Sequence, residues 1–418
     1  MKTRALVCLI SLLSLICNVY AQQFEPEKHK LIQTDREDGR YVSSRGFVHA
    51  LLKNMTPEYA FDENFTKEEM LVWQTKMQDS IKELMKHPAL QNLPVPQMVD
   101  EVQRDGYRVQ KWEAYPLPEC VVPYLVLIPD TIAANEKVPA VLCLPGKGKS
   151  KESAAGEPEL HAAYGPSVTE ERFVMALPFV RKGMIAVVVD NPGTAETSDL
   201  ERYARTGYQY DQIARVLLEL DWSYLGFSSY CSMHVLNWMK QHGNIRQDRL
   251  IACGFSLGTE PMMALGLMDT SIYAFVYNDF LCNTLERWLV LTEPNQRGIR
   301  NTPNTIMHLI PGFLKKFDFP DIVAAFAPRP VIFTEGGLDR DFHKVKKAYE
   351  IMGASENMEY HHYPKFENAM RTDLKSLPEG LNAEAYLELS NVDPPAHDMK
   401  MHQILPWLDI IRNPILIE

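Results

Sequence analysis

The chain has 418 residues, of which 46% are apolar and 23% are charged. This balance is typical of a soluble globular protein rather than of a disordered or fibrous one. Its formal net charge of -11 at pH 7 opposes binding to nucleic acid and to anionic membrane surfaces, and no run of Lys or Arg is dense enough to override that charge. We therefore expect neither of these partners.

The first residues have the pattern of a secretory signal peptide. Lys2 and Arg4 precede an apolar run over residues 5–16, and the small residue Ala21 ends a segment that resembles a signal peptidase site, which would leave Gln22 first. The apolar run is too short to span a bilayer as a stable helix, and no other long apolar stretch follows. The sequence thus predicts a signal peptide over residues 1–21 and an exported protein, periplasmic or secreted, without a membrane span.

Five cysteines follow the predicted signal peptide. Because their number is odd and they lack paired spacing, at least one thiol stays unpaired in a monomer. Cys143 and Cys253 stand inside apolar runs with the character of core strands, so we interpret them as small buried hydrophobic residues. No H-E-x-x-H motif and no Cys/His cluster with metal-ligand spacing occurs, and the sequence predicts neither a metal site nor a cofactor.

Residues 22–104 are polar and helix-prone, and they predict an N-terminal helical extension. Within this segment an amphipathic stretch opens at Lys67 and continues to Met85. The sequence Asn-Leu-Pro-Val-Pro at 92–96 then breaks the helical pattern. Strand-like runs follow, so we place a catalytic domain over residues 105–418.

In this second region, short apolar and β-branched runs alternate with helical stretches, including a long helical region over residues 208–241. Several of the runs are almost continuously apolar, as buried parallel strands are. The alternation predicts an α/β fold with a doubly wound, mostly parallel sheet and helices on both faces, and reactive groups in such folds collect at the carboxyl ends of the strands. The expected strands are residues 122–128, 140–144, 185–189, 250–255, 274–277 and 331–334.

The fourth of these strands ends in Gly254-Phe255-Ser256-Leu257-Gly258, and a helix-like segment over 260–267 follows. This is the G-x-S-x-G pattern between a strand and a helix, which predicts a nucleophile elbow with Ser256 as the nucleophile. Such an elbow strains the serine backbone, and its close neighbours must lack side chains for strand and helix to approach. Thr259-Glu260 stands where a further Gly is frequent, so an acidic group could line the pocket.

The chain resembles the α/β-hydrolase superfamily and, within it, the branch of dienelactone hydrolases and acetyl xylan esterases that includes many bacterial esterases of glycan breakdown. The resemblance covers most of the chain after the signal peptide, from about residue 105 to 408. It rests on the sequences Cys-Gly-Phe-Ser-Leu-Gly at 253–258, Phe-Pro-Asp-Ile at 319–322 and Ala-Pro-Arg-Pro at 327–330. The resemblance implies an α/β-hydrolase fold and a serine, acid, histidine order of the catalytic triad along the chain.

The triad acid is expected in the loop after the strand at 331–334. Asp339 matches the Gly-x-x-Asp position of the family, counted from Gly336, and is the preferred acid. Asp341 is close enough to be confused with it, although it could instead cap the following helix. Asp279, after the strand at 274–277, is a lesser alternative because some hydrolases carry the acid there.

The triad base is expected in a loop shortly before the last helix. His397 suits this position better than His402, because family members place the base ahead of an amphipathic terminal helix that ends in Trp-Leu. His402 would then be an ordinary helix residue, and His361 and His362, on a strand-like run, would be structural. In the implied mechanism the imidazole takes the serine proton and returns it to the leaving alcohol.

An oxyanion hole requires two backbone N–H groups, one from Leu257 and one from the loop at 145–149. This loop resembles the His-Gly-x-Gly segment of the family, and its second donor is expected to be the amide of Lys147 or Gly148. Pro145 replaces the usual histidine, so another group must hold the loop.

The substrate is less strongly indicated than the mechanism. Lys147 and Lys149, together with Arg297 and Arg300, could receive a carboxylate such as that of a uronic acid, although solvated surface charge is the more common role of such residues. Our hypothesis is a carbohydrate esterase that removes acetyl or methyl ester groups from a polysaccharide of pectin or xylan type. The alternatives are a secreted peptidase of the same fold and a catalytically inactive glycan-binding homologue.

Overall fold

The computed structural model describes residues 38–157, 159–160, 171–198, 209–300, 304–367 and 375–412. The chain divides into two compact units, Met1–Thr56 and Pro57–Glu418. In the described part of the first unit, helix α3 (Ser44–Lys53) begins where the side chain of Ser43 accepts a hydrogen bond from the amide of Gly46. None of its residues is buried. The predicted signal peptide lies outside the described residues.

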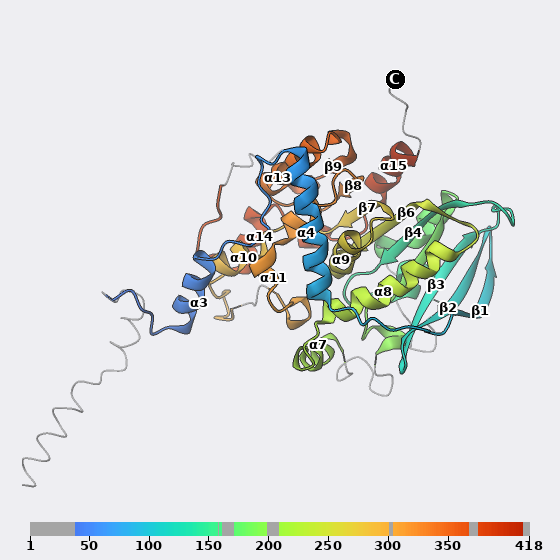
Figure 1. Cartoon of the computed structure of the whole chain (residues 1–418), viewed down its shortest axis with the longest axis horizontal. Coiled ribbons are helices and arrows are strands. Elements are labelled where there is room, and N and C mark those ends of the chain that lie inside the picture. Colours follow the sequence, from blue (N-terminus) through green and yellow to red (C-terminus); the bar gives the residue numbers. More distant parts are fainter. Residues whose placement is uncertain are drawn as a thin grey trace, which may run out of the picture. The chain divides into compact units, whose positions relative to one another are not determined.

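The second unit is built on a nine-stranded sheet with the order β1-β2-β3-β5-β4-β6-β7-β8-β9 (Figure 1). The pairs β1–β2, β2–β3 and β3–β5 are antiparallel, and all the pairs from β5 to β9 are parallel. The strands are β1 (Gln97–Arg104), β2 (Tyr107–Leu117), β3 (Cys120–Pro129), β4 (Val138–Leu144), β5 (Ile185–Val189), β6 (Ile245–Phe255), β7 (Ile272–Asn278), β8 (Val331–Phe333) and β9 (Met358–Tyr360).

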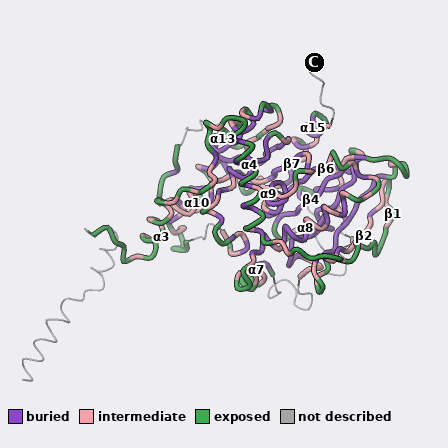
Figure 2. The backbone as a smooth tube through the Cα atoms, in the orientation of Figure 1, coloured by how far each residue is buried: buried purple, intermediate pink, exposed green. Residues whose placement is uncertain are grey.

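The central strands are buried on both faces, which explains their almost continuously apolar sequences. All five residues of β5 are buried, and the purple centre of Figure 2 follows these strands. Cys143 and Cys253 are register partners on β4 and β6, both are buried, and neither is in a disulfide. As predicted, they act as small hydrophobic residues, and burial raises the pKa of both thiols.

Helices cover both faces of the sheet, as predicted for a doubly wound fold. One face packs against α4 (Lys67–Met85), α8 (Tyr224–Gln241), α9 (Thr259–Met268), α12 (Phe319–Ala324) and α13 (Asp339–Ile351). The other face packs against α5 (Lys151–Ala155), α6 (Ala176–Arg181) and α15 (Met401–Arg412). Four further helices lie in connections: α7 (Tyr210–Glu219), α10 (Thr284–Val290), α11 (Phe313–Lys316) and α14 (Ala383–Leu389).

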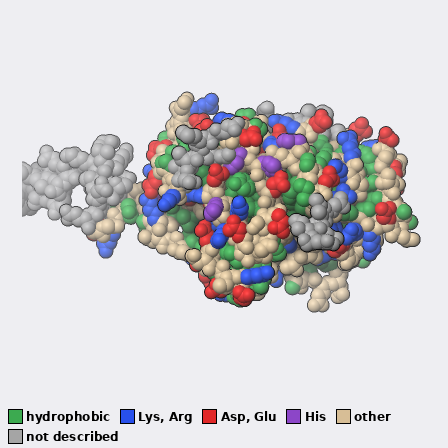
Figure 3. All heavy atoms as spheres, turned by 90° about the horizontal axis from the view of Figure 1, so that it is seen from above, with side chains coloured by type: hydrophobic (Ala, Val, Ile, Leu, Met, Phe, Trp, Pro, Cys, Tyr) green, Lys and Arg blue, Asp and Glu red, His purple; other side chains and the backbone are tan. Residues whose placement is uncertain are grey.

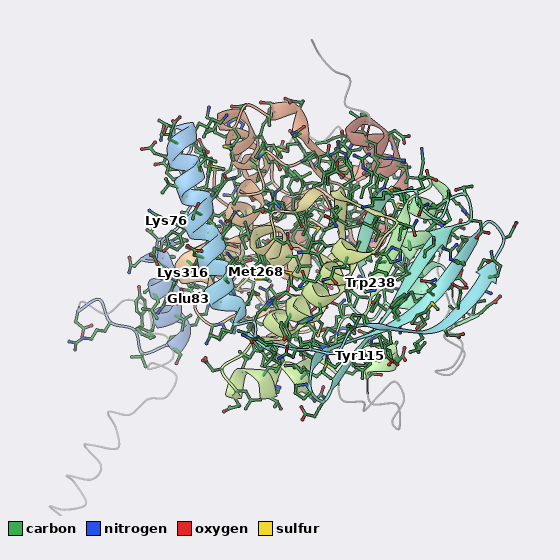
Figure 4. All side chains as sticks on the ribbon, turned by 45° about the vertical axis from the view of Figure 1, so that its right-hand side comes forward. Lys76, Glu83, Tyr115, Trp238, Met268 and Lys316 are labelled. Atoms are coloured by element: carbon green, nitrogen blue, oxygen red, sulfur yellow. The ribbon has the colours of Figure 1, made fainter. Side chains whose placement is uncertain are left out.

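Aromatic packing joins α8 to the antiparallel part of the sheet. Trp238 on α8 (labelled in Figure 4) has its ring centroid 4.9 Å from that of Trp112 on β2 and 5.3 Å from that of Tyr124 on β3. Tyr124 and Trp238 meet edge to face, a favoured geometry for buried rings. These contacts hold the antiparallel strands against the same helix layer that covers the parallel strands.

The predicted boundary at residue 104 differs from the division of the chain in the structure. Residues 97–104 form strand β1, and α4 contributes buried Met70, Trp73 and Met77 to the main core. The side-chain amide of Gln74 also donates hydrogen bonds to the carbonyl oxygens of Ala325 and Ala327, at 3.1 and 2.5 Å. The segment 57–104 is therefore part of the main unit rather than of a separate extension.

In its described residues, the helical region predicted over 208–241 consists of two helices, α7 and α8. The chain turns at Asp221, which has φ = +60°, and Ser223 caps the N-terminus of α8 by accepting a hydrogen bond from the amide of Gly226. The break lets α8 follow the sheet while α7 turns away from it.

Charged side chains of both signs are present on the surface. On the face that Figure 3 shows, Lys and Arg side chains are interspersed with Asp and Glu side chains. Within the described ranges, no helix is long and apolar enough to cross a membrane.

Candidate active site

The candidate nucleophile stands on a sharp bend where β6 runs into α9. Ser256 has φ = +50°, in the left-handed region that residues other than Gly seldom adopt. The flanking glycines permit the bend: a Cβ on Gly254 would lie 2.7 Å from the carbonyl oxygen of Gly258, and a Cβ on Gly258 would collide with the backbone of Leu144. This strand–turn–helix geometry is the elbow that the motif predicts.

Ser256 lines a cavity of about 370 Å³ at the carboxyl ends of β4, β6 and β7. His397 lines the same cavity, as do Lys147 and Leu257. The ring of His397 stacks on that of Phe255, the residue before the candidate nucleophile, with 4.7 Å between centroids and 25° between planes. The structure thus brings together the serine, the histidine and the loop that the sequence points to.

Glu335 is the carboxylate that contacts His397. Its Oε2 lies 2.5 Å from His397 Nδ1, and its Oε1 accepts hydrogen bonds from the amide of Asp398 at 3.0 Å and ion-pairs with Lys400 Nζ at 3.1 Å. Glu335 is fully buried, so the partners of both its oxygens are groups of the protein. A buried carboxylate on Nδ1 leaves Nε2 of the imidazole for the reacting atoms.

The structure does not pair Asp339 with His397, which differs from the prediction. Asp339 is the first residue of α13, its side chain is 42% exposed, and its Oδ1 lies 2.8 Å from Nε2 of His362. Glu335 lies beside His397 because it stands two residues after the end of β8, before two glycines, Gly336 and Gly337, with positive φ. A carboxylate directly after the predicted strand at 331–334 was the available signal, but the family spacing favoured Asp339 instead.

Of the two alternative acids, one is near the base. The ligand atoms of Asp279, Glu335 and His397 all lie within 4.8 Å of one another. Burial raises the pKa of Asp279 to about 6, against the opposing charge of His397. Asp341 is buried in α13 and is not a lining residue of the cavity, and burial raises its pKa to about 7.

The pKa of His397 is raised above its ordinary value. Burial alone would lower it, but the hydrogen bond with Glu335 and the charges of Asp279 and Glu335 together outweigh burial, and Lys400 opposes them. His402 is an exposed residue of α15, as predicted, and does not line the cavity.

The same three side chains form the one group in the described ranges whose spacing could hold a metal ion. A metal at this position would need a nitrogen of His397 and oxygens of both carboxylates. However, Nδ1 of His397 and Oε2 of Glu335 already share a 2.5 Å hydrogen bond, and Lys400 brings a positive charge to the other oxygen of Glu335. The chemistry of the group therefore fits an acid–base pair better than a metal centre.

The candidate oxyanion loop packs directly on the elbow, because a Cβ on Gly146 would lie 3.1 Å from the Cβ of Ser256. The amide of Gly148 donates a 2.7 Å hydrogen bond to the hydroxyl of Tyr210, so of the two amides predicted in this loop that of Lys147 is left as the candidate for the second oxyanion donor. The side chain of Asn191 donates a 2.6 Å hydrogen bond to the carbonyl oxygen of Pro145.

Tyr210 and Asn191 thus hold the loop in which Pro145 replaces the histidine of the family pattern. The Tyr210 hydroxyl also lies 2.8 Å from Oγ1 of Thr194, which fixes its position. Neither residue was identified from the sequence. Asn191 directly follows Asp190 at the end of β5, and Tyr210 begins α7, so only the topology brings them to the loop after β4.

Charged residues also line the cavity. Glu260, the acidic departure from the family pattern, lines the cavity, and its Oε1 lies 2.5 Å from Nδ1 of His308. Arg287 on α10 also lines it. Arg297 and Arg300, considered as carboxylate ligands from the sequence, are exposed and are not among the lining residues.

Comparisons with known proteins show a family and solved structures to which the chain is similar. Residues 23–410 match the model of the Abhydrolase family. The chain is similar to the crystal structure of a provisionally assigned acetyl xylan esterase from Bacteroides fragilis, with 52% identity and a TM-score of 0.86, over 93% of this chain and 100% of that one. It is similar in fold to a methylesterase, with 16% identity and a TM-score of 0.52, over 86% of this chain and 71% of that one. Among curated proteins, no sequence matches this chain.

Proposed function

We propose that this chain, which belongs to the Abhydrolase family and is an ester-hydrolysing enzyme, uses Ser256, His397 and Glu335 as its catalytic triad. The observation that carries the proposal is the pairing of a serine on a strained elbow with a histidine in the same cavity, whose Nδ1 meets a buried carboxylate at 2.5 Å. Serine hydrolases on unrelated folds share this constellation.

In the proposed mechanism, Nε2 of His397 takes the hydroxyl proton of Ser256 as the oxygen attacks the ester carbonyl. The amides of Leu257 and Lys147 stabilise the negative charge on the carbonyl oxygen. The imidazolium then gives its proton to the leaving alcohol, and water hydrolyses the acyl-enzyme by the same steps in reverse order. Glu335 fixes the tautomer of His397 and stabilises its charged form.

We further propose that the ester is on a polysaccharide, as an acetyl or methyl group on a glycan of pectin or xylan type, and that the enzyme acts after export. The relative with 52% identity carries the name of an acetyl xylan esterase, which supports this substrate class. Aromatic side chains from Phe280, Phe319 and Tyr363 line the cavity next to polar groups, a composition that suits the faces and hydroxyls of a sugar.

The test compares the wild type with Ser256→Ala on p-nitrophenyl acetate and on acetylated xylan and methyl-esterified pectin. We expect Ser256→Ala to abolish turnover, and a fluorophosphonate probe to label the wild type alone. Ser355→Ala, at an exposed position away from the cavity, is the matched control and should react as the wild type does. Full activity in Ser256→Ala would remove the proposed mechanism, and release of neither acetate nor methanol from the glycans would remove the proposed substrate.

A further inference from the structure

The lining of the cavity includes a guanidinium, that of Arg287, that has no counter-ion among the residues that the structure describes. Arg287 Nη1 donates a 3.1 Å hydrogen bond to the neutral side chain of Asn304, and the guanidinium lies 5.7 Å from the ring centroid of Phe280 and 5.6 Å from that of Tyr386. Its Nε is buried without a hydrogen-bond partner. Among the residues that the structure describes, no carboxylate lies within ion-pair distance of Arg287.

The acidic side chains around Arg287 form ion pairs or hydrogen bonds with other groups. Glu286, the neighbour of Arg287 on α10, forms an ion pair with Arg340 and accepts a 2.8 Å hydrogen bond from the amide of Leu377. Asp318 accepts hydrogen bonds from backbone amides at the start of α10, and Glu260 is paired with His308. These acids therefore have hydrogen-bond or ion-pair partners of their own, whereas Arg287 lines the cavity without an acidic partner among the described residues.

A half-buried cation without a counter-ion is costly, because it loses hydration and gains no opposite charge in return. Natural proteins keep such groups where a ligand supplies the missing charge, and the flat fork of a guanidinium matches the two oxygens of a carboxylate.

We propose that Arg287, with Asn304 beside it, forms a subsite for a carboxylate of the substrate, so that the glycan carries a uronic acid at or next to the esterified sugar. This inference rests on the proposed function, because it places an acidic sugar in the cavity of Ser256. The ring of Phe280 lies under the guanidinium and offers a face on which the same sugar can pack.

The test uses a galacturonate trisaccharide and the neutral galactose trisaccharide of the same linkage as competitors of p-nitrophenyl acetate. In the wild type we expect the acidic trisaccharide to inhibit at least tenfold more strongly than the neutral one. Arg287→Gln should weaken inhibition by the acidic trisaccharide about 10- to 100-fold and remove the difference between the two. Arg287→Lys keeps the charge but not the fork and should fall between the two.

Arg300→Gln is the matched control, since Arg300 belongs to the same connection but is exposed and donates to the carbonyl oxygen of Thr292 at 2.7 Å. It should keep the wild-type preference. Equal inhibition by the two trisaccharides, or an unchanged preference in Arg287→Gln, would overturn the inference. Calorimetric binding of the two trisaccharides to Ser256→Ala repeats the comparison without turnover, so the subsite is tested separately from the catalytic proposal.

Discussion

Replacing Glu335 by Gln tests the assignment of the triad acid most directly. The glutamine side chain keeps the shape of the original, but its amide N–H would donate to Nδ1 of His397 and force the imidazole into the tautomer that cannot accept the serine proton. In a serine protease, the equivalent change costs about 10,000-fold in kcat. Here Asp279 stays within 4.8 Å and retains part of the negative potential, so we expect a loss of about 1,000-fold in kcat, or roughly 4 kcal/mol of transition-state stabilisation.

The assay is the initial rate on p-nitrophenyl acetate, measured for Glu335→Gln and for Asp339→Asn as the matched control. Because Asp339 contacts His362 rather than His397, its variant should retain activity to within about twofold. Thermal unfolding of each variant shows whether a loss of rate reflects a loss of fold, since Glu335 also ion-pairs with Lys400. An equal loss of kcat in both variants, or a larger loss in Asp339→Asn, would refute the assignment of Glu335.

Three further results are expected. Since the pKa of His397 is raised and the base acts when neutral, kcat/KM of the wild type should reach half its plateau above about pH 6.5. Asp279→Asn removes a negative charge that favours the imidazolium, so it should shift this rise in kcat/KM to lower pH. A rise at the same pH or at higher pH would contradict this account. Tyr210→Phe should lower kcat about tenfold with little change in KM, because the oxyanion loop loses the acceptor of the Gly148 amide, whereas Tyr115→Phe should not. Dialysis against EDTA should leave the rate on p-nitrophenyl acetate unchanged, and restoration of a lost rate by an added divalent cation would instead indicate a metal site.

The fold could be predicted from the sequence where strands are buried on both faces. The runs at 140–144 and 185–189 correspond to β4 and β5, since a strand inside a parallel sheet must be apolar on both sides. The superfamily and the esterase branch were also recognisable, and the match over residues 23–410 and the relative with 52% identity confirm them. Strand β1 was not predicted, because most of its residues are exposed and its sequence lacks an apolar face.

The break between α7 and α8 was not predicted for a different reason. Both segments have helical sequences, and the turn between them depends on a single non-glycine residue, Asp221, in the left-handed region. Residues of this kind adopt that conformation only where surrounding structure compensates, so a local pattern cannot indicate it.

For the candidate site, the elbow was predictable because its constraints are local. The glycines at 254 and 258 are required by contacts within the strand–turn–helix segment and with the adjacent strand. The candidate acid was not predictable, because the contact between Glu335 and His397 joins residues 62 positions apart, and Asp339 rather than Glu335 matches the family spacing. The supports of the candidate oxyanion loop were missed because the hydrogen bonds that Asn191 donates and Tyr210 accepts produce no periodic pattern in the sequence.

The register of the sheet explains how His397, which is distant in the sequence, comes to line the same cavity as Ser256. Phe255 on β6 is the partner of Asn278 on β7, and Tyr277 on β7 is the partner of Phe333 on β8, so the three strands end at the same level. The side chain of Asn278 donates to the carbonyl oxygen of Asp398 at 2.9 Å and accepts from the amide of Lys400 at 2.9 Å.

Strand β7, which lies between β6 and β8, therefore holds both ends of the segment 398–400 through Asn278. Its amide side chain supplies a donor and an acceptor at once, which a carboxylate of the same size cannot do at neutral pH. The position of the base is thus set by the end of β7 as much as by Glu335, and Asn278 belongs to the site although it does not line the cavity.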